Sequence, residues 1–200
     1  MDASRISRTA TPIRGVRQGQ PIGAWTAWMT LGIFAVATST LLVSHVYLYW
    51  GQDVWPPPGY QAPALLRATI AMVLVVVGGA LTFAALRAMR AGRERTSGHI
   101  LFAAALVLAG CLTALIVDMT AAPWLWDEHV YTSLFWLNAG YAALFVAMSL
   151  LMLLALVIQR VAGVLDAERH LELQVVTILM IHTVAVVAVA YIMAYLLPHR

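Results

Sequence analysis

Histidine and cysteine are the residues of this chain that could hold a haem or a metal ion. The sequence has six histidines and one cysteine. A haem held between two histidines needs both ligands at one depth and facing each other. His182 lies about eleven residues into the last apolar stretch, near mid-membrane at about 1.5 Å per residue. No other histidine lies at that level, although His45 and His129 could pair nearer one surface.

Cys111 stands alone inside an apolar stretch. It lacks the paired spacing of a zinc or iron–sulfur site, so we expect a small buried residue. Together with the unmatched depths of the histidines, this predicts that the chain itself holds no haem, no redox metal and no other cofactor.

His182 is the most informative polar residue of the apolar stretches. Ionisable groups inside a membrane usually face protein or a cavity, so His182 could relay protons or bond a neighbouring helix. A neutral histidine in a structural hydrogen bond is the favoured interpretation. We expect Thr38, Ser39 and Thr40 to bond back to their own helix turns. The sequence shows no nucleophile–base set, no phosphate loop and no acid deep in an apolar stretch, which excludes a self-sufficient catalyst or an ion-coupled pump.

The composition is that of an integral membrane protein. Of 200 residues, 62% are hydrophobic and 10% are charged, against about 25% charged in soluble domains, and the mean hydropathy is +0.84. The net charge of +3 comes from arginines placed between apolar stretches. That placement indicates membrane topology and argues against a nucleic-acid partner.

Five apolar stretches are long enough to cross a bilayer, and lipid forces each to be a helix. They are Ala24–Tyr49, Ala64–Met89, His99–Thr120, Tyr131–Ile158 and Leu171–Leu197. Short connections make neighbouring helices antiparallel. We therefore predict an all-α membrane protein, with a disordered cytoplasmic tail over residues 1–23 and one bundle of five transmembrane helices over residues 24–198.

Arginine positions predict the orientation, because arginine-rich segments stay in the cytoplasm. Arginines gather in the amino-terminal segment and in the second and fourth connections. The third connection instead carries Asp118, Asp127 and Glu128 without arginine. The predicted amino terminus is cytoplasmic and the predicted carboxyl terminus is periplasmic.

The first connection contains Trp55-Pro56-Pro57-Pro58-Gly59. Three consecutive prolines prevent the helix from continuing and favour an extended backbone. The pattern favours a rigid turn at the membrane interface, with tryptophan anchors, or a docking edge for another subunit. Small residues such as Gly78, Gly79 and Gly110 indicate close helix packing, either within the bundle or against a partner protein.

Several of these landmarks resemble subunit III of haem-copper oxidases, in a short five-helix form. The Trp55-Pro56-Pro57-x-Gly59 loop is similar to that family's Trp-Pro-Pro-x-Gly loop. The family's long helix is matched by Tyr131-x-Ser133-x-Phe135 followed by Gly140-Tyr141. His182, within Ile181-His182-Thr183-Val184, falls where the family has Trp-His-Phe-Val-Asp. The resemblance covers about residues 25–198.

This sequence also departs from the family pattern. The family's buried glutamate in its first conserved helix is replaced by Thr40, both histidines of its Gly-Phe-His-x-x-His are missing after Gly140, and Ala185 replaces its aspartate. Roles that rest on those groups are not carried over to this chain.

The resemblance implies a non-catalytic subunit in a bacterial inner membrane. Such a subunit packs beside the catalytic haem-copper subunit and supports it in aerobic electron transport. The haems and copper are expected in the catalytic subunit and in other oxidase subunits. Trp55, Pro56, Pro57, Gly59, Tyr131, Ser133, Gly140 and His182 are the implied motif or interface residues. Two alternatives stay open: an accessory protein of nitric oxide reductase, and an independent small transporter.

Overall fold

The computed structural model of the chain describes residues 22–163, 165 and 171–199. In these residues, five helices are long and apolar enough to cross a membrane, which confirms the predicted all-helical architecture. They are α1 (Ile22–Trp50), α2 (Leu65–Arg90), α3 (Glu94–Thr120), α4 (Val130–Val161) and α5 (Leu171–Tyr191). A π-helical turn, Ile192–Leu196, and a 3₁₀ turn, Leu197–His199, continue α5. Most of the predicted tail lies outside the described residues, and Ile22 and Gly23 already belong to α1.

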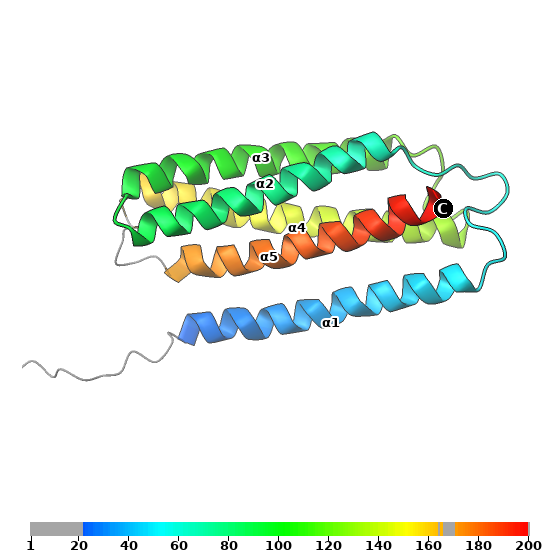
Figure 1. Ribbon diagram of the computed structural model, residues 1–200, viewed down its shortest axis with the longest axis horizontal. Coiled ribbons are helices and arrows are strands. Elements are labelled where there is room, and N and C mark those ends of the chain that lie inside the picture. Colours follow the sequence, from blue (N-terminus) through cyan, green and yellow to red (C-terminus); the bar gives the residue numbers. More distant parts are fainter. Residues whose placement is uncertain (1–21, 164, 166–170, 200) are drawn as a thin grey trace, which may run out of the picture.

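Helices α2 to α5 form a ring in which each packs against two neighbours, and α1 lies outside that ring (Figure 1). Helix α1 contacts α5 and, to a smaller extent, α4. In its most apolar window 11% of residues are buried, against 56% in α5. A three-to-four-residue spacing keeps one face of α1 toward α4 and α5. This inward side carries Ala27, Leu31, Phe34, Thr38, Leu41 and His45.

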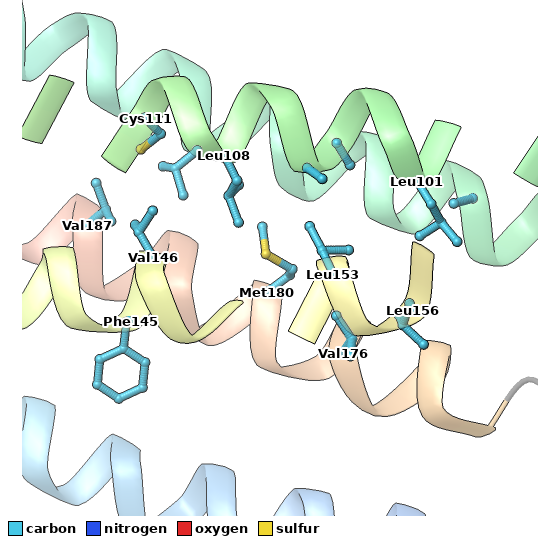
Figure 2. Close-up of a cluster of buried hydrophobic side chains, with 14 of the residues drawn as sticks. Leu101, Leu108, Cys111, Phe145, Val146, Leu153, Leu156, Val176, Met180 and Val187 are labelled. Carbon is cyan, nitrogen blue, oxygen red and sulfur yellow. The ribbon is translucent and has the colours of Figure 1, made fainter. Parts of the chain in front are cut away.

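The core of the ring is apolar and is filled from α2, α3, α4 and α5. Leu108 from α3, Val146 and Leu153 from α4, and Met180 from α5 point toward one another, whereas Phe145 points toward α1 (Figure 2). Cys111 is fully buried, as predicted, and its thiol donates to the carbonyl oxygen of Ala71 at 3.3 Å. A Cβ placed on Gly78 would overlap the side chain of Leu108, so this glycine allows the close approach of α2 and α3.

At the arginine-bearing ends of the helices, two boundaries differ from the predictions by three residues or more, and the other boundaries there by at most two. Helix α3 begins at Glu94, five residues before the predicted His99, and α4 extends past Ile158 to Val161. The predictions followed apolarity alone, but these turns project beyond the apolar stretches. Arg160 of α4 and Glu94 of α3 form an ion pair at 3.2 Å. Glu94 also lies in the first turn of α3, where the positive end of the helix dipole stabilises an acidic side chain.

The antiparallel arrangement gives the bundle two unlike ends. One end, which we call the arginine-rich end, carries the α2–α3 turn and the helix ends that flank it, with Arg87, Arg90, Arg93 and Arg95, together with Arg160 of α4. The opposite end, which we call the aromatic end, carries residues 51–64, residues 121–129 and the carboxyl-terminal turns. Charge and aromatic content therefore divide the molecule along its long axis.

Candidate functional site

Two of the predicted motif residues meet at the aromatic end. Trp55 of the first connection lies against Tyr131 of α4, with their ring centroids 5.0 Å apart and the rings at 79°. Trp55 also contacts the rings of His45 and Tyr49. The loop is therefore packed onto the bundle through its tryptophan. Its turn needs glycine at position 59, because Gly59 has φ of 94°, a conformation open mainly to glycine.

Tyr131 is the centre of a wider aromatic cluster. Trp124 contacts both Tyr131 and Phe135, and Phe135 contacts Tyr195 near the end of α5. Edge-to-face aromatic pairs contribute about 0.5–1.5 kcal/mol each beyond their buried area. Because these rings come from the connections, from α4 and from the π-helical turn that continues α5, the cluster fixes both connections to the helices at this end.

An ion pair with a buried carboxylate lies beside the aromatic cluster. Arg67 Nε donates to Asp118 Oδ1 at 2.9 Å, and the hydroxyl of Tyr195 donates to Asp118 Oδ2 at 2.5 Å. The Asp118 side chain is 2% exposed and that of Arg67 is 41% exposed. Three helical segments, α2, α3 and the π-helical turn that continues α5, thus meet at one carboxylate. Asp118 was counted among the charges of the third connection, although it lies inside the predicted stretch His99–Thr120. The structure places it in the last turn of α3, where its side chain is buried and paired rather than part of the charged connection.

A second polar contact joins α1 to α4. The side-chain amide nitrogen of Asn138 lies 3.0 Å from His45 Nδ1 and donates to the carbonyl of Leu134 at 2.7 Å. An amide nitrogen only donates, so His45 accepts through Nδ1. His129, the other candidate haem ligand at this level, instead accepts the Tyr131 backbone N–H through Nδ1 at the start of α4. Each histidine therefore has a structural hydrogen bond of its own.

His182 of α5 faces α1 and α4, away from the aromatic end. Its Nε2 is 3.4 Å from the Thr38 hydroxyl, which is also 3.2 Å from the Tyr141 hydroxyl. Thr38 gives its own hydrogen to the Phe34 carbonyl at 2.9 Å, so it accepts from its two neighbours. His182 stacks on Phe34 and meets Phe145 edge-on. This is the inter-helix contact predicted for a neutral histidine.

The neighbouring hydroxyls follow the same rule. Ser39 and Thr40 donate to the carbonyls of Ala35 and Val36, as Thr38 does to Phe34, which confirms the predicted bonding within the helix. Within residues 22–163, 165 and 171–199, no three histidine, cysteine, aspartate or glutamate side chains gather as a metal site would require.

The remaining predicted residues occupy separate positions. Pro57 is buried in the connection, and Pro56 follows a cis peptide bond with Trp55. The Ser133 hydroxyl donates to the carbonyl of Trp126 at 2.7 Å, which ties the third connection to α4. A Cβ on Gly140 would lie 3.7 Å from the side chain of Met119, an ordinary contact. The structure therefore brings together Trp55, Pro57, Tyr131 and Ser133 at the aromatic end, but not Gly140 or His182.

The Arg67–Asp118–Tyr195 and His45–Asn138 contacts were not predicted from the sequence. A usable signal existed for the first. Arg67 is two residues inside the start of α2, and Asp118 is two residues before the end of α3. Antiparallel neighbours joined by a short turn bring such positions to one level. No comparable signal marks Asn138, because nothing in the chain shows which face of α4 meets α1.

Comparison with known proteins gives the family. A comparison with curated proteins found no match to the chain. The family model of cytochrome c oxidase subunit III matches residues 21–198, which include all five helices and both connections at the aromatic end. The match spans the Trp55-Pro56-Pro57 loop, the Tyr131 region and His182 in one alignment. The chain therefore belongs to the cytochrome c oxidase subunit III family.

Proposed function

We propose that this chain is a non-catalytic subunit of a bacterial haem-copper oxidase, packing in the inner membrane beside the catalytic subunit and keeping it active in aerobic electron transport. The observation that carries the proposal is the family match over residues 21–198. The haems and copper belong to partner subunits, and this chain contributes a packing surface. The match does not favour a nitric oxide reductase accessory protein or a transporter.

The lateral faces of the bundle suit such a role. Large apolar side chains on the outer face of α1 are exposed, among them Ile33, Val36, Val43 and Tyr47. Lipid is as apolar as leucine, so helices in a membrane associate through close packing and hydrogen bonds. Ser39 and Thr40 lie on this same exposed face with hydroxyls already bonded to their own helix. A partner helix can therefore pack there without leaving a buried polar group unpaired.

Copurification tests the assignment. A tag on this chain, followed by gentle detergent extraction, should recover a catalytic haem-copper subunit by mass spectrometry and its haem spectrum. Deleting the gene should leave that haem spectrum largely intact while sustained turnover or stability declines. Recovery of a nitric oxide reductase subunit would move the chain to that complex, and recovery of the chain alone in several detergents would favour the transporter.

The proposed orientation has a cytoplasmic amino terminus and a periplasmic carboxyl terminus. Its support is the gathering of Arg87, Arg90, Arg93 and Arg95 at one end of the bundle, since arginine-rich segments stay in the cytoplasm. A reporter that works only in the periplasm should be active when fused after Arg200. A silent periplasmic reporter with an active cytoplasmic one would reverse the orientation.

A further inference from the structure

Helix α1 is held to the bundle along only part of its length. Phe34 packs on the ring of Phe145, which points toward α1 (Figure 2). Beyond it, the side chains of Thr38 and His45 lie within hydrogen-bond distance of groups on α4 and α5. Among the described residues, the side chains of residues 27–33 make no hydrogen bond to another helix and no ring contact. The part of α1 that is fixed by specific contacts therefore begins at Phe34.

An apolar pocket adjoins the part of α1 that precedes Phe34. It has a volume of about 410 Å³ and lies between α1, α4 and α5. Met148 and Met152 line it from α4, and methionine adapts readily to its surroundings because it is unbranched and has three rotatable bonds. Contacts of apolar side chains with protein and with lipid have similar free energies. Positions of α1 nearer to α4 and α5, or farther from them, therefore differ little in free energy.

Gly32 lies where the two parts of α1 meet. A Cβ placed on Gly32 would have no atom within 4 Å, so no close packing explains this glycine, in contrast to Gly78. Glycine inside a helix has more backbone freedom than other residues and weakens the helix at that point. Helix α1 can therefore bend at Gly32 without breaking a contact to α4 or α5.

The turns that follow Gly32 are weakened as well. The hydroxyls of Thr38, Ser39 and Thr40 donate to the carbonyls of residues 34–36, which the backbone amides of the helix also use. Such bonds often bend helices. No other helix in the described part of the chain has three of them in succession. Two independent features of the sequence thus soften α1 next to the pocket.

We propose that Gly32 is a hinge, about which residues 25–31 of α1 swing toward and away from α4 and α5 and so narrow and widen the apolar pocket. Trp25 lies seven residues before Gly32, about 10 Å along the helix axis. A bend of about 20° at Gly32 moves Trp25 by about 4 Å. The swing adjusts the angle of the outer face of α1 to a neighbouring helix, while residues 34–50 keep their place.

Double electron–electron resonance on the full chain in nanodiscs measures the swing. Spin labels on Trp25→Cys and Ile158→Cys report the distance between the swinging segment and α4. Labels on Val43→Cys and Leu137→Cys report the same for the fixed part of α1. All four side chains are exposed, and both pairs are built on Cys111→Ala so that no native thiol is labelled.

Two glycine variants separate the hinge from the general effect of an added methyl group. Gly32→Ala stiffens α1 without a clash. Gly110→Ala is the matched control inside α3, where the Cβ would lie 3.8 Å from the side chain of Leu74, an ordinary contact. The distance distribution between positions 25 and 158 should be broader than that between positions 43 and 137, by about 4 Å. Gly32→Ala should narrow the first distribution to the width of the second, and Gly110→Ala should leave both unchanged.

The opposite results are equally clear. Equal widths for the two label pairs would overturn the hinge, because residues 25–31 would then be held as firmly as the rest of α1. A broad first distribution that Gly32→Ala leaves unchanged would overturn Gly32 as the bending point. The measurement uses this chain alone, so neither result depends on which partner copurifies with it.

Discussion

The two ends of the bundle contain similar interactions in different surroundings. Each has an arginine–carboxylate pair between neighbouring helices, Arg67–Asp118 at the aromatic end and Arg160–Glu94 at the arginine-rich end. The Asp118 side chain is 2% exposed, whereas that of Glu94 is 35% exposed. Removing an arginine therefore leaves a carboxylate inside the protein at one end and a carboxylate reached by solvent at the other.

The attachment of α1 differs between the ends in the same way. Toward the aromatic end, His45 is buried and bonded to Asn138, and Trp55 covers it. Toward the arginine-rich end, an apolar pocket of about 410 Å³ separates α1 from α4 and α5. Apolar contacts to a helix and to lipid have similar free energies. The polar and aromatic contacts therefore set the position of α1, and they lie at the aromatic end and at mid-membrane.

The largest expected difference is between the two arginines. Arg67→Met should destabilise the protein by about 3 kcal/mol, because it leaves the Asp118 carboxylate buried without its counter-charge. Arg160→Met should cost about 1 kcal/mol or less, since Glu94 can be hydrated. Thermal unfolding in one detergent measures both. Equal losses would mean that carboxylate burial does not decide the strength of these pairs.

A double variant separates two contributions to this loss: the missing ion pair, and the cost of a carboxylate left buried without its partner. Adding Asp118→Leu to Arg67→Met removes the stranded carboxylate, so the double variant should regain more than half of the lost stability. Tyr195 then loses its acceptor, which leaves a residual cost of about 1 kcal/mol. A double variant as unstable as Arg67→Met alone would show that the packing of the three helices depends on the side chains themselves.

The next effect concerns the hold on α1. Asn138→Leu should destabilise the protein by about 1–2 kcal/mol, because His45 stays buried without its donor. The backbone amides of α1 should then exchange their hydrogens faster, as measured by hydrogen–deuterium exchange mass spectrometry. Thr30→Val is the control on the other half of α1. Among the described residues the Thr30 hydroxyl bonds only its own helix, through the Thr26 carbonyl, so this variant should change stability by about 0.5 kcal/mol or less. Unchanged exchange in Asn138→Leu would show that α1 is held elsewhere.

These contrasts also mark how much the sequence could predict. Apolar length and arginine placement were enough for the five helices and for the division into unlike ends, because lipid leaves the backbone few choices. The partners of buried polar groups were harder. The position of Asp118 along its apolar stretch indicated its depth in the bundle. It did not indicate that the side chain points into the bundle, where it pairs with Arg67 and Tyr195. In lipid, apolar residues cover every face of a helix, so periodicity does not identify the buried one.

The smallest expected effect is at the pocket beside α1. Ala27 lines this opening, and Ala27→Leu should change stability by about 0.5 kcal/mol or less, because the added carbons replace lipid with protein of the same polarity. Ala139→Leu is the overpacking control inside the ring of α2 to α5, where the side chain is fully enclosed, and it should cost about 1–3 kcal/mol. Paired thermal melts in nanodiscs measure the difference. A cost above about 1 kcal/mol for Ala27→Leu would mean that α1 closes onto α4 and α5 in the membrane, and the contrast between the two halves of α1 would then disappear. A neutral Ala27→Leu beside a damaging Ala139→Leu would instead identify the arginine-rich half of α1 as the part of the bundle that adapts to what lies next to it.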